Sequence, residues 1–202
     1  MNNKIIFLSK QEYIEFKKNI FEQDNIKNIY ICVENKVYIS ISKLDTLNMI
    51  EIIYYKNDDF SDAFLIEYYL LNGKKIKKIT YNNGQVNDID NKPAIIVYND
   101  EGEITREFFI KNGNYHNING PAIKEYANNL CIDCTYCINN IRFTEEKYYN
   151  YINSIKNGTI LNTLYFTSYN KLKEILEIAK FYNNKEIQIE CEKLLIIKKL
   201  EN

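Results

Sequence analysis

Short apolar runs of strand length recur along the first three quarters of the chain, between polar stretches rich in Asn, Asp and Gly. Runs of this length bounded by turn-forming residues are typical of β-strands. In the first part of the chain they are KIIFL (4–8), NIYICV (28–33), VYISIS (37–42) and MIEIIYY (49–55). We therefore expect a mainly β-stranded protein in which the second and third of these runs form a hairpin.

One helix is predicted after the first run. Ser9 is followed three residues later by Glu12, the spacing of a capping box, in which each side chain bonds the other residue's backbone. Tyr13, Phe16 and Ile20 then fall on one face of that helix. We assign residues 1–60 to an N-terminal α/β segment and leave open whether it continues the sheet of the next segment.

The middle of the chain contains a repeat. PAIIVYNDEGEITREFFIKN (93–112) aligns without gaps to PAIKEYANNLCIDCTYCINN (121–140), 28 residues further on. Asn-Gly, a strong hairpin signal, recurs at 72–73, 83–84, 112–113 and 119–120. Residues 61–145 are therefore predicted to form successive β-hairpins in one elongated sheet.

The last part of the chain changes to helical periodicity. Residues 144–158 predict a helix that ends at Gly158, and apolar stripes within 172–182 and 187–195 predict two more. The last two should form an antiparallel pair, packed on the sheet or on each other. The predicted fold is thus α+β: an antiparallel β-hairpin repeat sheet with an N-terminal helix and a C-terminal helical pair. Residues 146–202 are predicted to form a C-terminal helical cap.

CIDCTYC (131–137) contains three of the five cysteines at a spacing that suggests a metal site. By the 28-residue repeat, however, this segment is a strand. Alternation would then point Cys131 and Cys137 to one face and Cys134 to the other, too dispersed for one metal ion. We favour three structural cysteines over a metal or redox site, and expect no metal and no cofactor.

Catalytic chemistry has little support in the sequence. The only histidine, His116, has no nucleophile motif around it, and phosphate-binding glycine motifs are absent. Carboxylate pairs such as Asp58-Asp59 and Asp88 with Asp90 are better explained as turn residues. We therefore expect a non-enzymatic protein without catalytic residues.

Composition limits the partners and the compartment. The 26 basic and 27 acidic residues nearly balance, which argues against nucleic-acid binding, and no run is long enough to cross a membrane. An odd number of cysteines, and an N-terminus without the long apolar core of a signal peptide, favour a soluble, cytoplasmic protein. Tyrosines in register on the repeat could offer a partner-binding surface, for which the candidate residues are Tyr98, Tyr115, His116 and Tyr126.

The segment NGNYHNINGPAI (112–123) resembles one copy of the MORN-like repeats of giant DNA viruses, which also occur in some bacteria and phages. The matching positions are Asn112, Gly113, His116, Gly120, Pro121 and Ala122. The copy at 83–94 keeps both ends but has Asn87 at the His position and Lys92 in place of the glycine. The resemblance covers about 80 residues, and it implies a virus-encoded hairpin scaffold, in the host cytoplasm or the virion, without known catalytic residues.

A second resemblance concerns residues 172–195, which are similar to the closing helices of BTB/Skp1-type domains. It implies oligomerisation or recruitment of a host ubiquitin-ligase component. Two functions are thus carried forward: a scaffold that binds a protein partner through its repeat sheet, and an adaptor that binds through its last helices. We also expect self-association, because an open sheet edge is a template for pairing.

Overall fold

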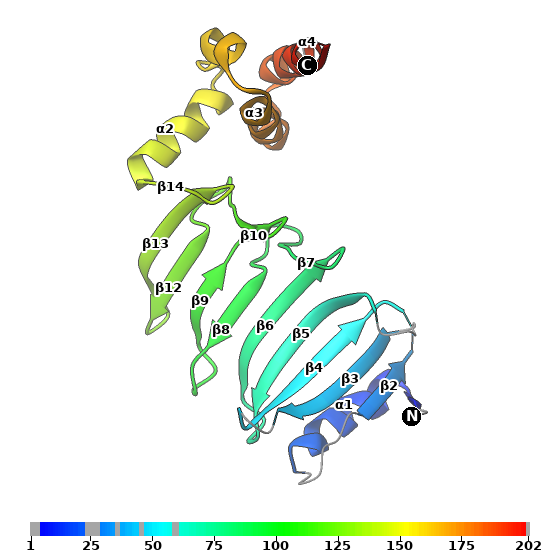
Figure 1. Ribbon diagram of the computed structural model, residues 1–202. Coiled ribbons are helices and arrows are strands. Elements are labelled where there is room, and N and C mark those ends of the chain that lie inside the picture. The colour runs from blue at the N-terminus through cyan, green and yellow to red at the C-terminus, as the bar shows by residue number, and fades with distance from the viewer. Residues whose placement is uncertain (1–4, 23–28, 35–36, 45–46, 58–60, 201–202) are drawn as a thin grey trace. The chain divides into compact units, whose positions relative to one another are not determined.

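The computed structural model describes residues 5–22, 29–34, 37–44, 47–57 and 61–200. The chain divides into two compact units, residues 1–141 and 142–202. The first contains the sheet and one helix, and the second contains the remaining helices (Figure 1). The α+β class, the large antiparallel sheet, the N-terminal helix and the C-terminal helices are confirmed.

The strands of the main sheet follow one another nearly in sequence order. The order is β1-β2-β3-β4-β5-β6-β8-β9-β12-β13-β14, with β7 paired to β6. The bounds are β1 (Ile5–Leu8), β2 (Ile29–Val33), β3 (Val37–Leu44), β4 (Met49–Tyr55), β5 (Ala63–Leu70), β6 (Lys75–Asn82), β7 (Gln85–Val86), β8 (Ile95–Tyr98), β9 (Ile104–Phe108), β12 (Ile123–Ala127), β13 (Leu130–Ile138) and β14 (Ile141–Phe143). A separate small hairpin joins β10 (Ile110–Lys111) to β11 (Asn114–Tyr115). β1 pairs with β2 in parallel, whereas the neighbours from β2 to β13 pair antiparallel.

The N-terminal segment continues the sheet. β4 pairs with β5 over seven residue pairs, from Met49–Leu70 to Tyr55–Ala63, so strands from both of the predicted segments belong to one sheet. The open question about residues 1–60 is answered in favour of continuation. The division into 1–60, 61–145 and 146–202 otherwise stays a prediction.

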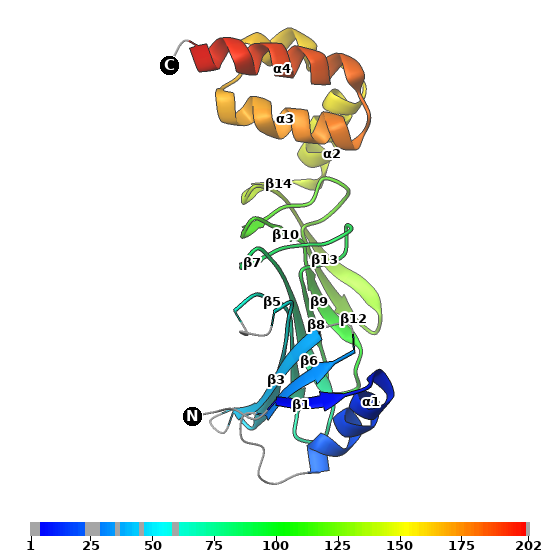
Figure 2. The same ribbon diagram turned by 90° about the vertical axis from the view of Figure 1, so that its right-hand side faces the viewer.

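Helix α1 (Lys10–Asn19) packs against one face of this sheet (Figure 2). Its predicted capping box is present: Glu12 N donates to Ser9 Oγ at 3.2 Å, and Ser9 N donates to the Glu12 carboxylate at 2.7 Å. A short 3-10 turn, η1 (Ile20–Glu22), follows the helix. The core beneath the helix consists of the buried residues Ile20, Ile31, Val33, Ile39, Ile41, Ile50, Ile52 and Tyr69, with Tyr13 and Phe16 packed against them. The predicted apolar face of α1 is therefore confirmed.

Asparagine-rich turns connect the hairpins of the middle segment. The Asn-Gly pairs at 83–84 and 112–113 both have positive φ at each residue, as a tight two-residue turn requires. Asn128-Asn129 and Asn139-Asn140 adopt the same left-handed conformation and turn β12 into β13 and β13 into β14. Asn tolerates this region better than other non-glycine residues, so these turns need no glycine.

The second unit is helical. Helix α2 (Glu145–Lys156) begins at the cap Thr144, α3 (Tyr169–Phe181) begins at the cap Ser168, and α4 (Lys185–Leu200) follows. The 3-10 segment η2 (Leu161–Phe166) lies between α2 and α3. Helices α3 and α4 run side by side, and Ile175, Ile178, Cys191 and Leu194 are buried within the unit (Figure 2). The predicted pair is thus present, with its helices packed on each other.

Candidate protein-interaction surface

A row of apolar side chains crosses the sheet on the face opposite α1. The residues pair directly across adjacent strands, so they point to the same side of the sheet. We call this row the apolar ladder; its members are Ile53, Ile66, Ile79, Ile95, Phe108 and Ile123, one from each of β4, β5, β6, β8, β9 and β12. Six neighbouring strands at about 4.8 Å spacing make this row about 24 Å wide.

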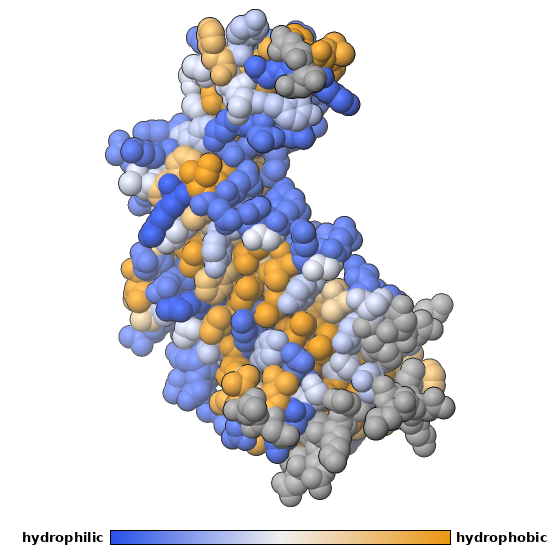
Figure 3. All heavy atoms as spheres, viewed as in Figure 1, coloured by the Kyte–Doolittle hydropathy of each residue, from blue (hydrophilic) through white to orange (hydrophobic). Residues whose placement is uncertain are grey.

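The apolar ladder remains partly accessible. Ile79 is 7% exposed and the other members are half-buried. Helix α1, the described helix of the same unit, packs on the opposite face of the sheet. Apolar residues gather over these central strands in the space-filling view (Figure 3). Contiguous apolar surface of this kind is typical of a binding surface rather than of a freely solvated sheet.

Charged and aromatic side chains flank the apolar ladder on the same face. The adjacent row contains Tyr68, Lys77, Val97, Arg106 and Glu125, paired across successive strands. Arg106 Nε lies 3.2 Å from a Glu125 carboxylate oxygen, and the Lys77 ammonium lies 6.0 Å from the Tyr68 ring centroid. An apolar strip with a polar rim is the usual anatomy of a protein interface.

The tyrosines predicted as a partner surface lie elsewhere. By register, Tyr98 and Tyr126 point to the α1 face of the sheet, away from the apolar ladder. Tyr126 donates its hydroxyl to Glu107 at 2.7 Å, and burial together with this acceptor raises the Tyr126 pKa above its ordinary value. Tyr115 is 39% exposed, and its ring lies 6.2 Å from that of Phe108, a member of the apolar ladder.

His116 is placed in the interior, with 3% of its surface exposed. Its Nδ1 lies 2.8 Å from Asn139 Oδ1, and its backbone N–H donates to Phe109 O at 3.1 Å. The first bond ties the loop after β11 to the turn between β13 and β14, and the second ties this loop to the residue between β9 and β10. His116 therefore lies in the environment of a packing residue, and it does not lie on the surface for which it was a candidate.

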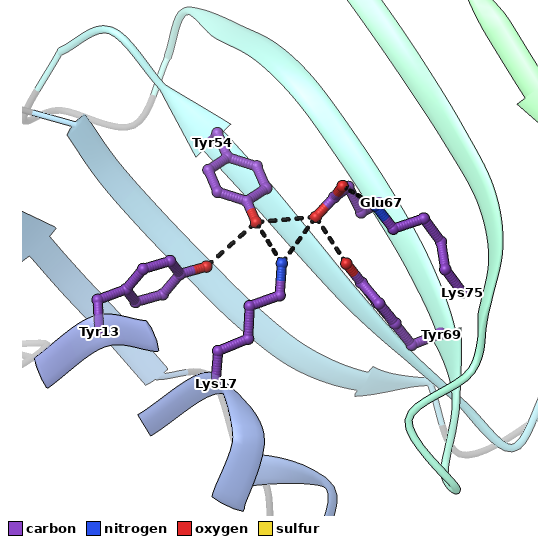
Figure 4. A network of polar contacts seen from close by, with 6 residues as sticks. All are labelled: Tyr13, Lys17, Tyr54, Glu67, Tyr69 and Lys75. Carbon is purple, nitrogen blue, oxygen red and sulfur yellow. Dashed lines mark hydrogen bonds and ion pairs between the residues drawn. The ribbon is translucent and has the colours of Figure 1, made fainter. Parts of the chain in front are cut away.

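The strongest cluster of ionisable groups surrounds Glu67 on β5 (Figure 4). Lys17 Nζ donates to Glu67 Oε2 at 2.9 Å and to Tyr54 Oη at 2.8 Å. The Tyr54 and Tyr69 hydroxyls each donate to Glu67 Oε2 at 2.8 Å, and Lys75 donates to Glu67 Oε1. Sequence reasoning missed this cluster because its members come from α1, β4, β5 and β6.

The charge balance around Glu67 determines its protonation. Burial raises the pKa of Glu67, but hydrogen bonds from Lys75 and Lys17 outweigh burial and hold that pKa at about 2. Burial likewise raises the pKa of Tyr13, whose hydroxyl lies 3.1 Å from that of Tyr54, to about 12. A fully ionised carboxylate and neutral phenols, all hydrogen-bonded to one another, hold α1 on the sheet. This arrangement fits a structural role better than proton transfer at neutral pH.

The cysteine prediction for β13 was wrong in one respect. Cys131 and Cys134 lie on the same face, with their Sγ atoms 2.9 Å apart, because a register shift opposite Glu125 and Tyr126 inserts an extra residue between them. Cys137 is buried further along the strand. No group of three or more potential metal ligands occurs among the described residues, Asp88 and Asp90 included; Asp58 and Asp59 lie outside that part of the chain.

The helical unit has a groove of its own, with mixed polar and apolar lining. A cavity of about 490 Å³ between η2 and α4 is lined by Leu161, Asn162, Glu186, Ile189, Glu190 and Lys193. Exposed apolar side chains continue along the same elements, among them Ile189 (54%), Ile197 (45%) and Phe166 (87%). None of the helices in the described part of the chain is both long enough and apolar enough to span a membrane.

Comparison of the chain with models of protein families, with curated proteins and with solved structures found no match.

Proposed function

We propose that the protein is a non-enzymatic scaffold that binds a protein partner through the apolar ladder and its polar rim. The observation that carries this proposal is the continuity of the ladder: six directly paired apolar residues on one accessible face. The patch of about 800 Å² that one partner contributes to an average interface is about 28 Å on a side, so the apolar ladder, at about 24 Å, spans most of one dimension of such a patch.

The chemistry of the remaining clusters also favours binding over catalysis. The carboxylate of Glu67 is held by two lysines and two tyrosines. By contrast, the ladder face combines apolar area, tyrosine and arginine, the residue types that are enriched at interfaces. The resemblance to MORN-like hairpin repeats agrees with a scaffold and with a virus-encoded protein acting in the host cytoplasm or the virion.

Two adjacent residues of β8 offer a matched test. Ile95 belongs to the apolar ladder, whereas Ile96 points to the α1 face, and both are half-buried. Ile95→Thr and Ile96→Thr each keep a β-branched side chain and remove similar apolar area. Tagged protein is purified from its native cell, and the bound proteins are quantified for the wild type and for both variants.

We expect Ile95→Thr to bind a specific partner about tenfold more weakly than the wild type, which corresponds to a loss of about 1.4 kcal/mol of binding free energy. Ile96→Thr should bind the partner as the wild type does. Equal retention by both variants, with the sheet intact by circular dichroism, would contradict the proposal. So would a reproducible enzymatic turnover abolished by one substitution.

The alternative function is an adaptor that uses the helical unit. It is favoured by the groove between η2 and α4, by the exposure of Ile189 in the lining of that groove, and by the exposure of Phe166 at the end of η2. The substitution Ile189→Ser in the full-length chain removes an exposed side chain at little cost to folding. Loss of the partner in this variant, together with retention in Ile95→Thr, would favour the adaptor, including recruitment of a ubiquitin-ligase component.

A further inference from the structure

Two thiols meet on the outer strand of the hairpin β12–β13. Cys131 is exposed and Cys134 is half-buried, and their Sγ atoms are 2.9 Å apart. In a regular strand, residues three apart point to opposite faces. The proximity of these two sulfur atoms therefore requires a local departure from regular strand geometry.

That departure is a β-bulge at Ile132. Tyr126 pairs with Cys131, and the next residue towards the start of β12, Glu125, pairs with Asp133, so Ile132 is left without a counterpart. Asp133 fixes the bulge: its Oδ1 accepts from Cys134 N at 2.9 Å, and its carbonyl accepts from Cys131 Sγ at 3.4 Å. The bulge turns both thiols to the same side of the strand.

We propose that Cys131 and Cys134 form a redox modification site that reacts with small-molecule disulfides and closes into a reversible intrachain disulfide. In the first step the Cys131 thiolate attacks a disulfide RSSR, giving a mixed disulfide Cys131–S–S–R and releasing RS⁻. In the second, the Cys134 thiolate attacks Cys131 Sγ and releases the other RS⁻. Overall, two protein thiols lose two electrons and two protons, and RSSR becomes two RSH.

The surroundings assign the order of the two thiols. Cys131 is open to solvent, whereas burial, followed by the neighbouring Cys131 thiol, raises the pKa of Cys134 to about 11. Cys131 is therefore the thiol that meets the small disulfide, and Cys134 closes the ring. Lys124, the cross-strand neighbour of Cys134, favours the Cys134 thiolate during that step.

The other cysteines are not placed to do this. Cys137 and Cys191 are buried, and the Sγ of Cys32 lies beside its own strand, 3.9 Å from Val33 O. Cys32 is therefore a suitable control residue, because like Cys134 it lies in a strand and is half-buried.

The experiment equilibrates the full-length protein with glutathione buffers of increasing disulfide content, followed by alkylation of the remaining thiols and intact-mass spectrometry. We expect the wild type to lose two alkylatable thiols together and to retain no glutathione. Cys134→Ser should retain one glutathione on Cys131, and Cys131→Ser should retain neither adduct nor disulfide. Cys32→Ser should behave as the wild type.

Two results would overturn the proposal. One is a wild-type protein that retains a stable glutathione adduct in place of the internal disulfide. The other is full alkylation of all cysteines in buffers that oxidise exposed dithiols of reference peptides. Circular dichroism of each variant shows whether the sheet is intact, and because Cys131 is exposed, its replacement by serine should not prevent folding.

Discussion

Glu67→Gln is the substitution that most directly tests the polar cluster under α1. The glutamine keeps the shape of the side chain but removes its charge, so Lys17 and Lys75 lose their common anion. The Glu67 side chain is 8% exposed, so solvent screens the interaction little. A pKa lowered from 4.5 to about 2 corresponds to about 3 kcal/mol, at 1.36 kcal/mol per pKa unit.

The sign of the pH dependence follows from the direction of that change. Because folding lowers the pKa of Glu67, its contribution to stability is complete above about pH 4.5 and is lost as the pH falls towards about 2. We therefore expect Glu67→Gln to lower the free energy of unfolding by about 3 kcal/mol at neutral pH. The difference from the wild type should shrink steadily between about pH 5 and pH 2.

Urea denaturation followed by circular dichroism measures the free energy of unfolding, and hydrogen exchange of α1 and β5 locates the change. Glu125→Gln is the matched control, since its ion pair with Arg106 leaves 37% of the Glu125 side chain exposed and should contribute less than about 1 kcal/mol. If Glu67→Gln unfolded like the wild type at neutral pH, the cluster would not stabilise α1. A loss that did not change with pH would show that charge is not its cause.

Three further outcomes are expected from the same geometry. Folding raises the pKa of Tyr13 to about 12. Its neutral form therefore contributes fully to stability below about pH 10, and this contribution is lost as the pH rises through about 12. Spectrophotometric titration should show a phenol that ionises at higher pH in the native protein than in urea. Asn139→Gly keeps the positive φ of residue 139 but removes the bond to His116, and should cost about 1 kcal/mol in urea denaturation. The control Asn128→Gly, at a similar φ, should cost less than half of that. Ser9→Ala removes the cap of α1 and should cost about 1 kcal/mol, with the loss confined to exchange of the first turn of the helix.

Local patterns in the sequence predicted most of the secondary structure. The run at 49–55 coincides with β4, and the Ser9–Glu12 pair forms the predicted cap. Signals of this kind depend on residues within one turn or one strand, where side-chain spacing and backbone preference suffice. The two Asn-Asn turns were not predicted, because they lack the glycine of the Asn-Gly hairpin signal.

Features that depend on the pairing of distant segments were not predicted. The ungapped alignment placed Cys134 at the position of Arg106, which points to the ladder face, whereas Cys134 points to the α1 face. Both hairpins have a register shift at the same place in their first strand, but the pairing in β12–β13 is displaced by one residue: Val97 pairs with Arg106, whereas Glu125 pairs with Asp133 instead of Cys134. The Glu67 cluster was missed for a related reason: a single glutamate in an apolar strand was visible, but its lysine partners are 50 residues before it and 8 after it.

The sequential strand order has a consequence for how the chain reaches its native state. From β2 to β13 each strand of the main sheet pairs with strands close to it along the chain, so few long loops must close before stabilising contacts form. Such local topology favours rapid folding for a β-rich protein. Each hairpin can add to the preceding one as it leaves the ribosome. Gain or loss of one hairpin would lengthen or shorten the sheet without changing how the other strands pair, so the size of the sheet could change during evolution.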